Sequence, residues 1–197
     1  MITRITGSKP RFLALLAATV SVAVAACGNF TGVPASIPTL SDSGVVYAIN
    51  GAPPGAPTAL HVFSGTLLAA DASFLFDVAF DLDSAGNVVY RPVSTIASGL
   101  AGSHSVGLQT STESYDAIER APGSGYHADT ALVTRPNVAV LVQSHDTQAC
   151  GVSLTGSTLY AKIVVTAVDP VSRQLKVRYT VDSNCGFRSF ASGVPKD

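Results

Sequence analysis

The clearest pattern in the chain is an alternation of hydrophobic and polar residues in the stretch FLFDVAFDLDSAGNVVYRPV. A period of two is typical of a half-buried strand. Asp83 and Gly86 suit a tight turn, and residues 88–90 return as a partner strand that ends near Pro92. We therefore expect a β-hairpin over residues 74–93. Its core side would hold Phe76, Val78 and Phe80, and its solvent side Asp77, Asp81 and Asp83.

A second hairpin is predicted by TLYAKIVVTAVDPVSRQLKVRYTV. Asp169 and Pro170 begin the turn, because proline presets the backbone for the second position of a turn. Two sets of residues alternate along the first strand: Leu159, Ala161, Ile163 and Val165 against Tyr160, Lys162, Val164 and Thr166. On the return strand Leu175, Val177, Tyr179 and Val181 point inward, with Lys176 and Arg178 outside.

Shorter patterns predict further strands at residues 45–49, 60–63, 105–109 and 138–143. A short helix is expected in ESYDAIERA, capped by Thr112 and stopped at Pro122. Many short strands separated by turn residues favour a mainly all-β fold. We expect a single antiparallel domain over residues 44–197, either a small barrel or a sandwich, with one or two short helices.

The first 26 residues have the layout of a secretory signal. Three basic residues, Arg4, Lys9 and Arg11, precede an apolar run over residues 12–26. A transmembrane helix needs about 20 apolar residues, so a membrane-spanning anchor is the weaker interpretation of this shorter run.

The end of this run, Val24-Ala25-Ala26-Cys27, resembles the lipobox of bacterial lipoproteins. The resemblance implies that residues 1–26 are a signal peptide and that Cys27 becomes a diacylated N-terminus holding the protein to the membrane. In Gram-negative members an Asp after the cysteine commonly signals retention in the inner membrane, whereas this chain has Gly28. The resemblance thus implies a cell-envelope protein of the outer membrane. The alternative is ordinary signal cleavage after Ala25, which gives a secreted, unanchored protein.

Composition predicts a tether and disfavours one class of partner. Residues 27–43 are rich in Gly, Pro and hydroxyl side chains and have no periodicity, which predicts a flexible tether. The rest of the chain after the leader has 9 basic and 13 acidic residues, which disfavours nucleic acid as a partner. The excess of bases over residues 130–197 suits a solvated surface or contact with the polyanions of an envelope.

The chain has three cysteines, and an odd thiol is unfavourable in an exported protein. If Cys27 is acylated, Cys150 and Cys185 remain and are expected to form a disulfide in an oxidising compartment. Closing that loop would stabilise the fold by about 3–4 kcal/mol. Two separate buried thiols and a zinc pair are the alternatives.

Scattered histidines provide candidate ligand-binding residues, but no metal-binding spacing such as H-E-x-x-H is present. Solvated surface histidines are the alternative, and neither a metal nor a cofactor is predicted. The strand YAKI resembles the C-terminal part of some haem-binding bacterial lipoproteins, but no histidine ligand matches. The candidates are His104, His127, Asp129 and His145.

The spacing of residues in the sequence does not match two other kinds of site. A calcium loop counted from Asp81 would have Ala85 at position 5 and Pro92 at position 12, neither of which supplies the required side-chain oxygen. A hydrolase would require G-x-S-x-G, and GSHSVG around Ser105 lacks the first glycine. The segment GSGYHAD places Ser124 near His127 and Asp129, although triads assemble in space and not in sequence.

The segments 103–105 and 123–129 are expected in loops and are the predicted location of a binding site. We therefore expect a lipid-anchored envelope lipoprotein whose β-domain binds a partner or plays a structural part without catalysis. A metal- or haem-binding lipoprotein and an envelope hydrolase are the alternatives.

Overall fold

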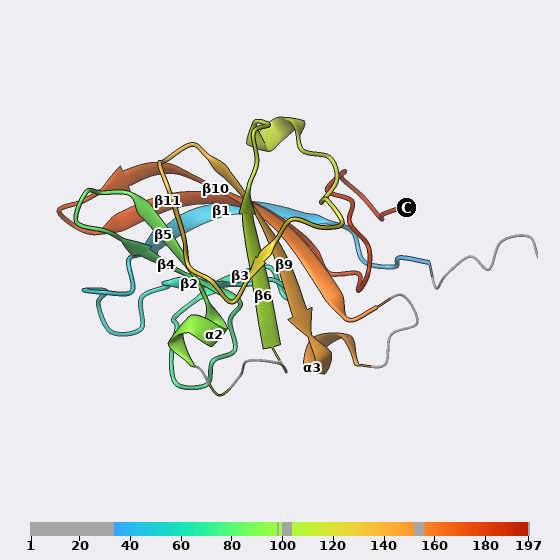
Figure 1. The fold of residues 1–197 in the computed structure, drawn as a ribbon, viewed down its shortest axis with the longest axis horizontal. Coiled ribbons are helices and arrows are strands. Elements are labelled where there is room, and N and C mark those ends of the chain that lie inside the picture. Colours follow the sequence, from blue (N-terminus) through green and yellow to red (C-terminus); the bar gives the residue numbers. More distant parts are fainter. Residues whose placement is uncertain (1–33, 98, 100–103, 152–155, 197) are drawn as a thin grey trace, which may run out of the picture. The chain divides into compact units, whose positions relative to one another are not determined.

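The computed structural model describes residues 34–196 apart from 98, 100–103 and 152–155. Within these residues the chain forms two antiparallel sheets that pack face to face (Figure 1). The predicted all-β class is confirmed, and of the two architectures the sandwich is the one observed; the described strands form no closed barrel. None of the helices in the described part has the length and apolar character needed to cross a membrane.

The larger sheet has six strands in the order β1-β11-β10-β9-β6-β7. Their bounds are β1 Leu40–Tyr47, β6 His104–Thr110, β7 His127–Ala128, β9 Ala139–Asp146, β10 Thr158–Asp169 and β11 Gln174–Asp182. Residues 40–43, which were expected in the tether, pair with β11 and so belong to the domain.

The smaller sheet has five strands in the order β3-β2-β4-β5-β8. Their bounds are β2 Ala59–His61, β3 Thr66–Leu68, β4 Val78–Leu82, β5 Val88–Pro92 and β8 Leu132–Thr134. Two one-turn helices follow strands, α2 Val93–Ile96 after β5 and α3 Thr147–Cys150 after β9, and a 3₁₀ turn, η2, spans Tyr115–Ala117.

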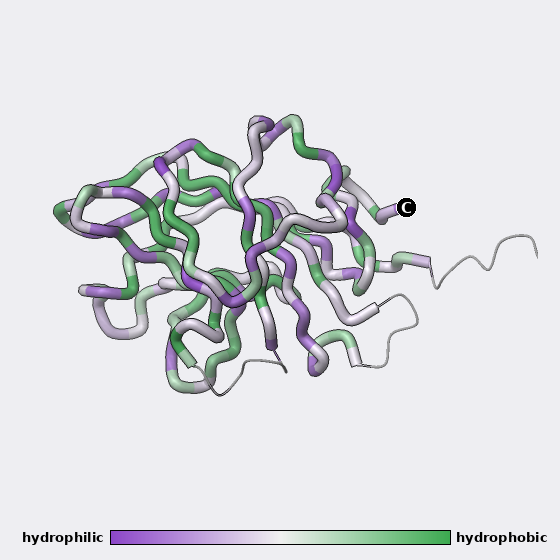
Figure 2. Tube along the Cα trace, in the orientation of Figure 1, coloured by the Kyte–Doolittle hydropathy of each residue, from purple (hydrophilic) through white to green (hydrophobic). Residues whose placement is uncertain are grey.

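The core lies between the two sheets and draws on both. Phe80 and Tyr90 of the smaller sheet contact one another edge to face, with ring centroids 5.7 Å apart. Leu108, Ile163 and Tyr179 of the larger sheet belong to the same buried cluster. Hydrophobic and hydrophilic residues alternate along the long strands in Figure 2, as expected for strands that bury one face.

The first predicted hairpin is confirmed as β4 and β5, with Phe80 opposite Tyr90. It is shorter than expected, because Phe74 has a left-handed backbone (φ 52°) and Leu75 is exposed, so β4 begins only at Val78. Asp83 accepts hydrogen bonds from the backbone N–H groups of residues 85 and 87, as its predicted turn role requires.

The predicted solvent-facing positions of Asp77 and Asp81 are wrong, since each residue is only 1% exposed. The carboxylate of Asp81 is covered by Asn50, Arg91 and Arg173, which lie in the β1–β2 loop, in β5 and in the β10–β11 turn. Both hairpin turns lie at the same end of the sandwich (Figure 1), which brings Arg173 to Asp81.

The second predicted hairpin is confirmed as β10 and β11, with a register shift between Val165 and Ala167. The inward set is buried as expected. The opposite face is also covered over most of its length, because the segment 111–122 and Phe190 pack on it. Lys162 is therefore buried, while Thr166 is exposed.

The helix predicted in ESYDAIERA is wrong: only the 3₁₀ turn η2 forms there, and Ser114 precedes it in place of Thr112. In a helix the carbonyl of Ile118 would accept from residue 122, but Pro122 has no N–H. The backbone N–H of Ala121 bonds instead to the carbonyl of Arg188 at 2.7 Å.

The predicted disulfide between Cys150 and Cys185 is confirmed, with 5.8 Å between the two Cα atoms. It joins the end of α3 to the segment that follows β11. Cys27 and the predicted signal peptide, residues 1–26, lie outside the described residues.

Candidate functional site

The four candidate ligand-binding residues lie on or beside β6, β7 and β9 but do not form one centre. His104 begins β6 and is mostly buried, whereas His127 in β7 is exposed. His145 in β9 bonds through Nδ1 to Ser157 Oγ at 2.9 Å. Among the described residues no three His, Cys, Asp or Glu side chains converge as metal ligands would.

Asp129 acts as a local anchor. It has a left-handed backbone (φ 50°), and its carboxylate accepts hydrogen bonds from the hydroxyls of Ser94 and Ser105 and from the N–H of Val106. Burial works to raise the pKa of Asp129, but these three bonds and the nearby His104 hold it below its ordinary value. The bonds of Asp129 join α2 to β6 and give it a structural role, and these bonds involve neither Ser124 nor His127.

His104 bonds to the buried Asp77, and the same ring nitrogen has a longer contact of 3.5 Å to Ser144 Oγ. His104 Nε2 lies 2.9 Å from Asp77 Oδ1, and Ser144 Oγ donates to the same oxygen. The other carboxylate oxygen accepts from the N–H of Val62 at 2.6 Å. Asp77 precedes β4 of the smaller sheet, while His104 and Ser144 lie in the larger sheet. This network therefore ties the two layers together.

The network shifts the ionisation of His104. Burial by itself lowers the pKa of His104, but the hydrogen bond and charge of Asp77, with Asp146 and Asp129 nearby, outweigh burial and raise it above its ordinary value. The protonated imidazole is thus favoured in the fold.

Serine, histidine and aspartate meet here, but not in the arrangement of a hydrolytic triad. In a triad the imidazole lies between the two, one ring nitrogen on the serine and the other on the acid. Here Ser144 Oγ and His104 Nε2 both bond to Asp77 Oδ1, and Ser144 is fully buried (0% exposed). A nucleophile must reach its substrate, so this geometry fits a structural anchor.

A small cavity of about 140 Å³ lies beside His104. His61, Phe74, Leu75 and Asp146 contribute to its lining. The left-handed backbone of Phe74 and the exposed side chain of Leu75 lie at its wall. Its volume suits a few water molecules and is below the range of most ligand sites.

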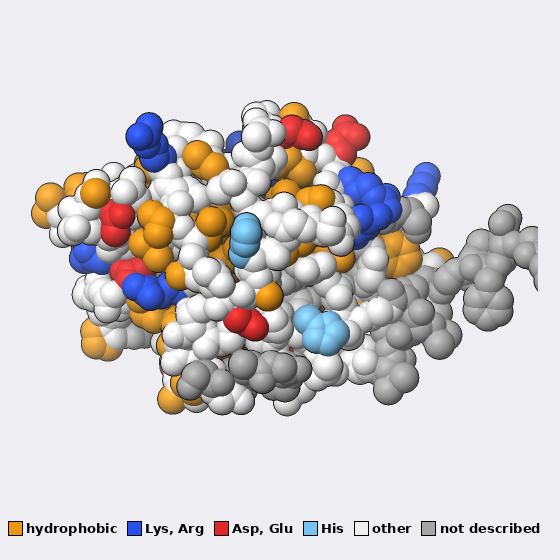
Figure 3. All heavy atoms as spheres, viewed as in Figure 1, with side chains coloured by type: hydrophobic (Ala, Val, Ile, Leu, Met, Phe, Trp, Pro, Cys, Tyr) orange, Lys and Arg blue, Asp and Glu red, His pale blue; other side chains and the backbone are white. Residues whose placement is uncertain are grey.

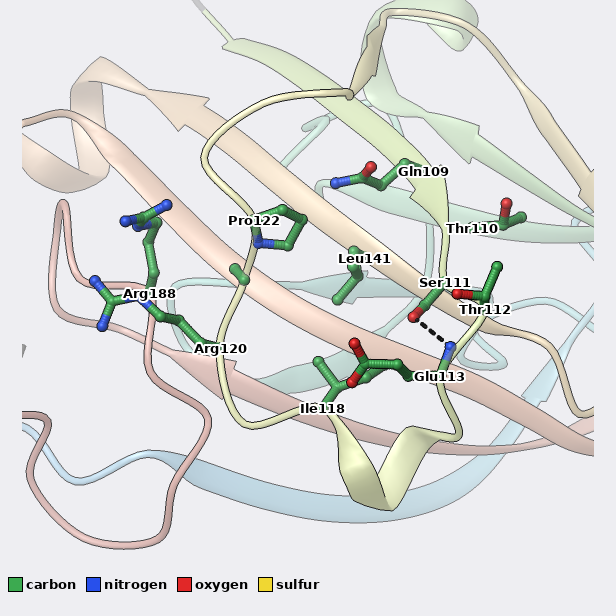
Figure 4. A pocket seen from close by; sticks show the side chains of 11 residues that line it. Gln109, Thr110, Ser111, Thr112, Glu113, Ile118, Arg120, Pro122, Leu141 and Arg188 are labelled. Atoms are coloured by element: carbon green, nitrogen blue, oxygen red, sulfur yellow. Dashed lines mark hydrogen bonds between the residues drawn. The ribbon is translucent and has the colours of Figure 1, made fainter.

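A larger recess of about 540 Å³ lies on the outer face of the six-stranded sheet and is bordered by the segment 111–122 (Figure 4). Its floor is formed by the buried residues Ile118, Ala121 and Leu141. Polar side chains line the rest: Gln109 from β6, Ser111, Thr112 and Glu113 from the segment after it, and Arg120 and Arg188. This recess combines an apolar floor with a few polar groups, which is typical of small-molecule sites.

Two arginines mark one end of the recess. Arg120 pairs with Ser189 in an isolated antiparallel bridge, so residues 119–121 run beside residues 188–190. In Figure 4 the guanidinium groups of Arg120 and Arg188 lie at the same end, away from Glu113 and Thr112. Basic side chains also gather beside the C-terminal segment on the face shown in Figure 3.

Lys162 holds the segment that forms the wall of the recess. Its ammonium group donates to the carbonyl oxygens of Tyr115 at 2.9 Å and Ile118 at 2.8 Å. It also lies over the rings of Tyr115 and Phe190, at 4.5 Å and 5.6 Å from their centroids. Burial lowers the pKa of Lys162, with opposing contributions from nearby acids.

No protein-family model, no curated protein and no solved structure matches this chain. The observations that bear on function are therefore the sequence of residues 1–27, the fold and the side chains.

The sequence pattern identified His104 and Asp129 but missed Asp77, Lys162 and the arginines of the recess. The burial of Asp77 depends on β6 and β9, which follow it by 27 and 67 residues. One signal was available for Lys162: it stands among Tyr160, Ile163 and Val164 in a strand with few other polar residues.

Proposed function

We propose that the chain is a lipid-anchored envelope lipoprotein whose β-sandwich binds a ligand or partner without catalysis. The observation that carries the anchor is the sequence Val24-Ala25-Ala26-Cys27 after a basic and apolar leader. Two acyl chains or more hold a protein firmly at a membrane, whereas one binds only marginally. A diacylated Cys27 would thus be a sufficient anchor.

The disulfide supports export. Disulfides persist in oxidising compartments and are rare where thiols are kept reduced. Cys150 and Cys185 are bonded to each other, which leaves Cys27 as the one cysteine for acylation. The geometry around Asp77 argues against hydrolysis by this cluster, because Ser144 is enclosed and shares its acceptor with His104.

The anchor is tested by metabolic labelling with radioactive palmitate in a Gram-negative host. Wild-type protein should incorporate the label and sediment with outer-membrane vesicles on a density gradient. Cys27→Ser should lose the label and leave the membrane fraction. The matched control is the double variant Cys150→Ser/Cys185→Ser, which removes the other two cysteines and should still be labelled.

Two results would count against the lipid anchor at Cys27, and a third against the outer membrane as its location. Wild-type protein that is exported, unlabelled and free of the membrane would show ordinary signal cleavage. Label retained in Cys27→Ser would show that another residue carries the lipid. Labelled protein at the inner membrane would preserve the anchor but contradict the outer-membrane location.

A further inference from the structure

The recess bordered by residues 111–122 has an unusual construction. Its wall is an irregular segment, which bonds to residues 188 and 190 through Ala121 and Glu119. A buried lysine is costly unless its donors are satisfied. Here two of the donors of Lys162 bond to carbonyl oxygens of this segment. The segment is therefore held in a fixed position over the sheet.

That fixed position lets two arginines from distant parts of the sequence line the same recess. The bridge between residues 120 and 189 sets the spacing of their backbones. Arg188 lies close across Gly123: a Cβ at that position would be 2.7 Å from Arg188 Nη1. The glycine thus leaves room for the guanidinium at the end of the recess.

Paired guanidinium groups are suited to oxyanions. Each is planar, permanently charged and has five N–H donors that match the oxygens of a carboxylate or phosphate. Arg120 and Arg188 also interact with other parts of the protein. Five donors allow each of them to keep such a contact while binding an anion.

The rest of the recess is suited to the hydrocarbon part of a ligand, called its carbon body below. Ile118, Ala121 and Leu141 give an apolar floor next to the arginine end. A volume of about 540 Å³ lies within the range of small-molecule sites. Gln109 and Glu113 provide polar groups at the rim.

We propose that this recess binds a small organic oxyanion. Arg120 and Arg188 hold the head group, which is a carboxylate or a phosphate monoester, and the carbon body lies on Ile118 and Leu141. The site goes beyond the proposed lipid anchor and does not depend on it, because every residue that lines the recess belongs to the β-domain.

The test is titration calorimetry on the full protein as purified from its host, with a non-ionic detergent present only if the protein carries lipid. The probes are hexanoate, hexyl phosphate, inorganic phosphate and hexanol. Saturable binding of hexanoate or hexyl phosphate is expected, with no binding of hexanol. The preferred probe of the two identifies the head group, and weaker binding of inorganic phosphate measures the contribution of the carbon body. Affinity should also fall as salt increases.

Variants locate the site. Arg120→Gln and Arg188→Gln should each weaken binding about tenfold or more, as the loss of a charge-assisted hydrogen bond requires. Arg135→Gln is the matched control, since it removes an exposed arginine outside the recess and should bind as the wild type does. Gly123→Ala should weaken binding by displacing Arg188, while its far-ultraviolet circular dichroism and melting temperature stay near those of the wild type.

Three outcomes would overturn the proposal. These are the absence of saturable binding of every anion, equal binding of hexanol and hexanoate, and unchanged affinity in both arginine variants. A failure of palmitate labelling would leave this proposal intact, so the two proposals fail separately.

Discussion

The ammonium group of Lys162 donates a hydrogen bond to the carbonyl oxygen of Ile118 at 2.8 Å. In a helix that carbonyl would accept from Pro122, which has no N–H to give. The lysine therefore takes the place of the missing backbone donor, and it holds an irregular segment on the outer face of the sheet. Within residues 113–121 only the 3₁₀ turn η2 forms.

Lys162→Met tests this contact. Methionine keeps most of the length and the apolar stem of lysine but removes the donors, so the carbonyl groups of Tyr115 and Ile118 lose their partner. We expect a loss of about 1–3 kcal/mol in the free energy of unfolding in urea. Amide exchange should quicken in residues 113–121 before it does in β10.

Lys176→Met is the control for Lys162→Met, since Lys176 is exposed on the neighbouring strand β11. A surface substitution of this kind should change stability by no more than about 0.5 kcal/mol. Equal effects of the two variants would show that Lys162 does not hold the segment.

Asp81→Asn should destabilise the fold. The sequence pattern placed Asp81 at a solvent-exposed position, where the same substitution would have little effect. The variant keeps the size of the side chain but removes the charge that Arg91 and Arg173 approach at 3.3 Å and 3.0 Å. We expect a loss of about 1–3 kcal/mol in the free energy of unfolding, measured by urea titration. Glu119→Gln, at an exposed position, should change it little, and a similarly small effect of Asp81→Asn would contradict the buried role.

Much of the fold was predictable because its strands have a period of two and its turns have strong local signals. Val78 and Phe80, or Ile163 and Val177, face the core as the alternation predicts. The outer faces were not predictable in this way. Asp81 and Lys162 stand at polar positions of alternating strands, and only distant segments, such as Arg173 and Tyr115, cover them.

The candidate site was predictable only in part, for the same reason. Cys150 and Cys185 could be paired by counting thiols, and His104 and Asp129 were visible as isolated titratable residues. The pairing of His104 with Asp77 and the approach of Arg120 to the 188–190 segment depend on strand order. Local periodicity contains no information on strand order.

Reduction of the Cys150–Cys185 bond should destabilise the domain. The bond closes a loop with a sequence separation of 35 residues, for which chain entropy predicts a contribution of about 3–4 kcal/mol. The melting temperature should therefore fall on addition of a reductant. In the double variant Cys150→Ser/Cys185→Ser it should be low already and should not respond to the reductant. Two reactive thiols in the exported, unreduced wild-type protein would contradict the bond.

The contact between His104 and Asp77 should make stability depend on pH. Because the pKa of His104 is raised in the fold, the folded state favours the protonated imidazole. Its contribution is fully present below the unfolded pKa of about 6.5 and is lost as pH rises through the higher folded pKa. The stability difference between wild type and His104→Gln should thus be larger at about pH 5.5 than at about pH 8, measured by urea unfolding. His127→Gln, which changes an exposed histidine outside the network, is the control. A difference for His104→Gln that stays constant over this range, or grows with pH, would show that the imidazole does not bind Asp77 as a cation.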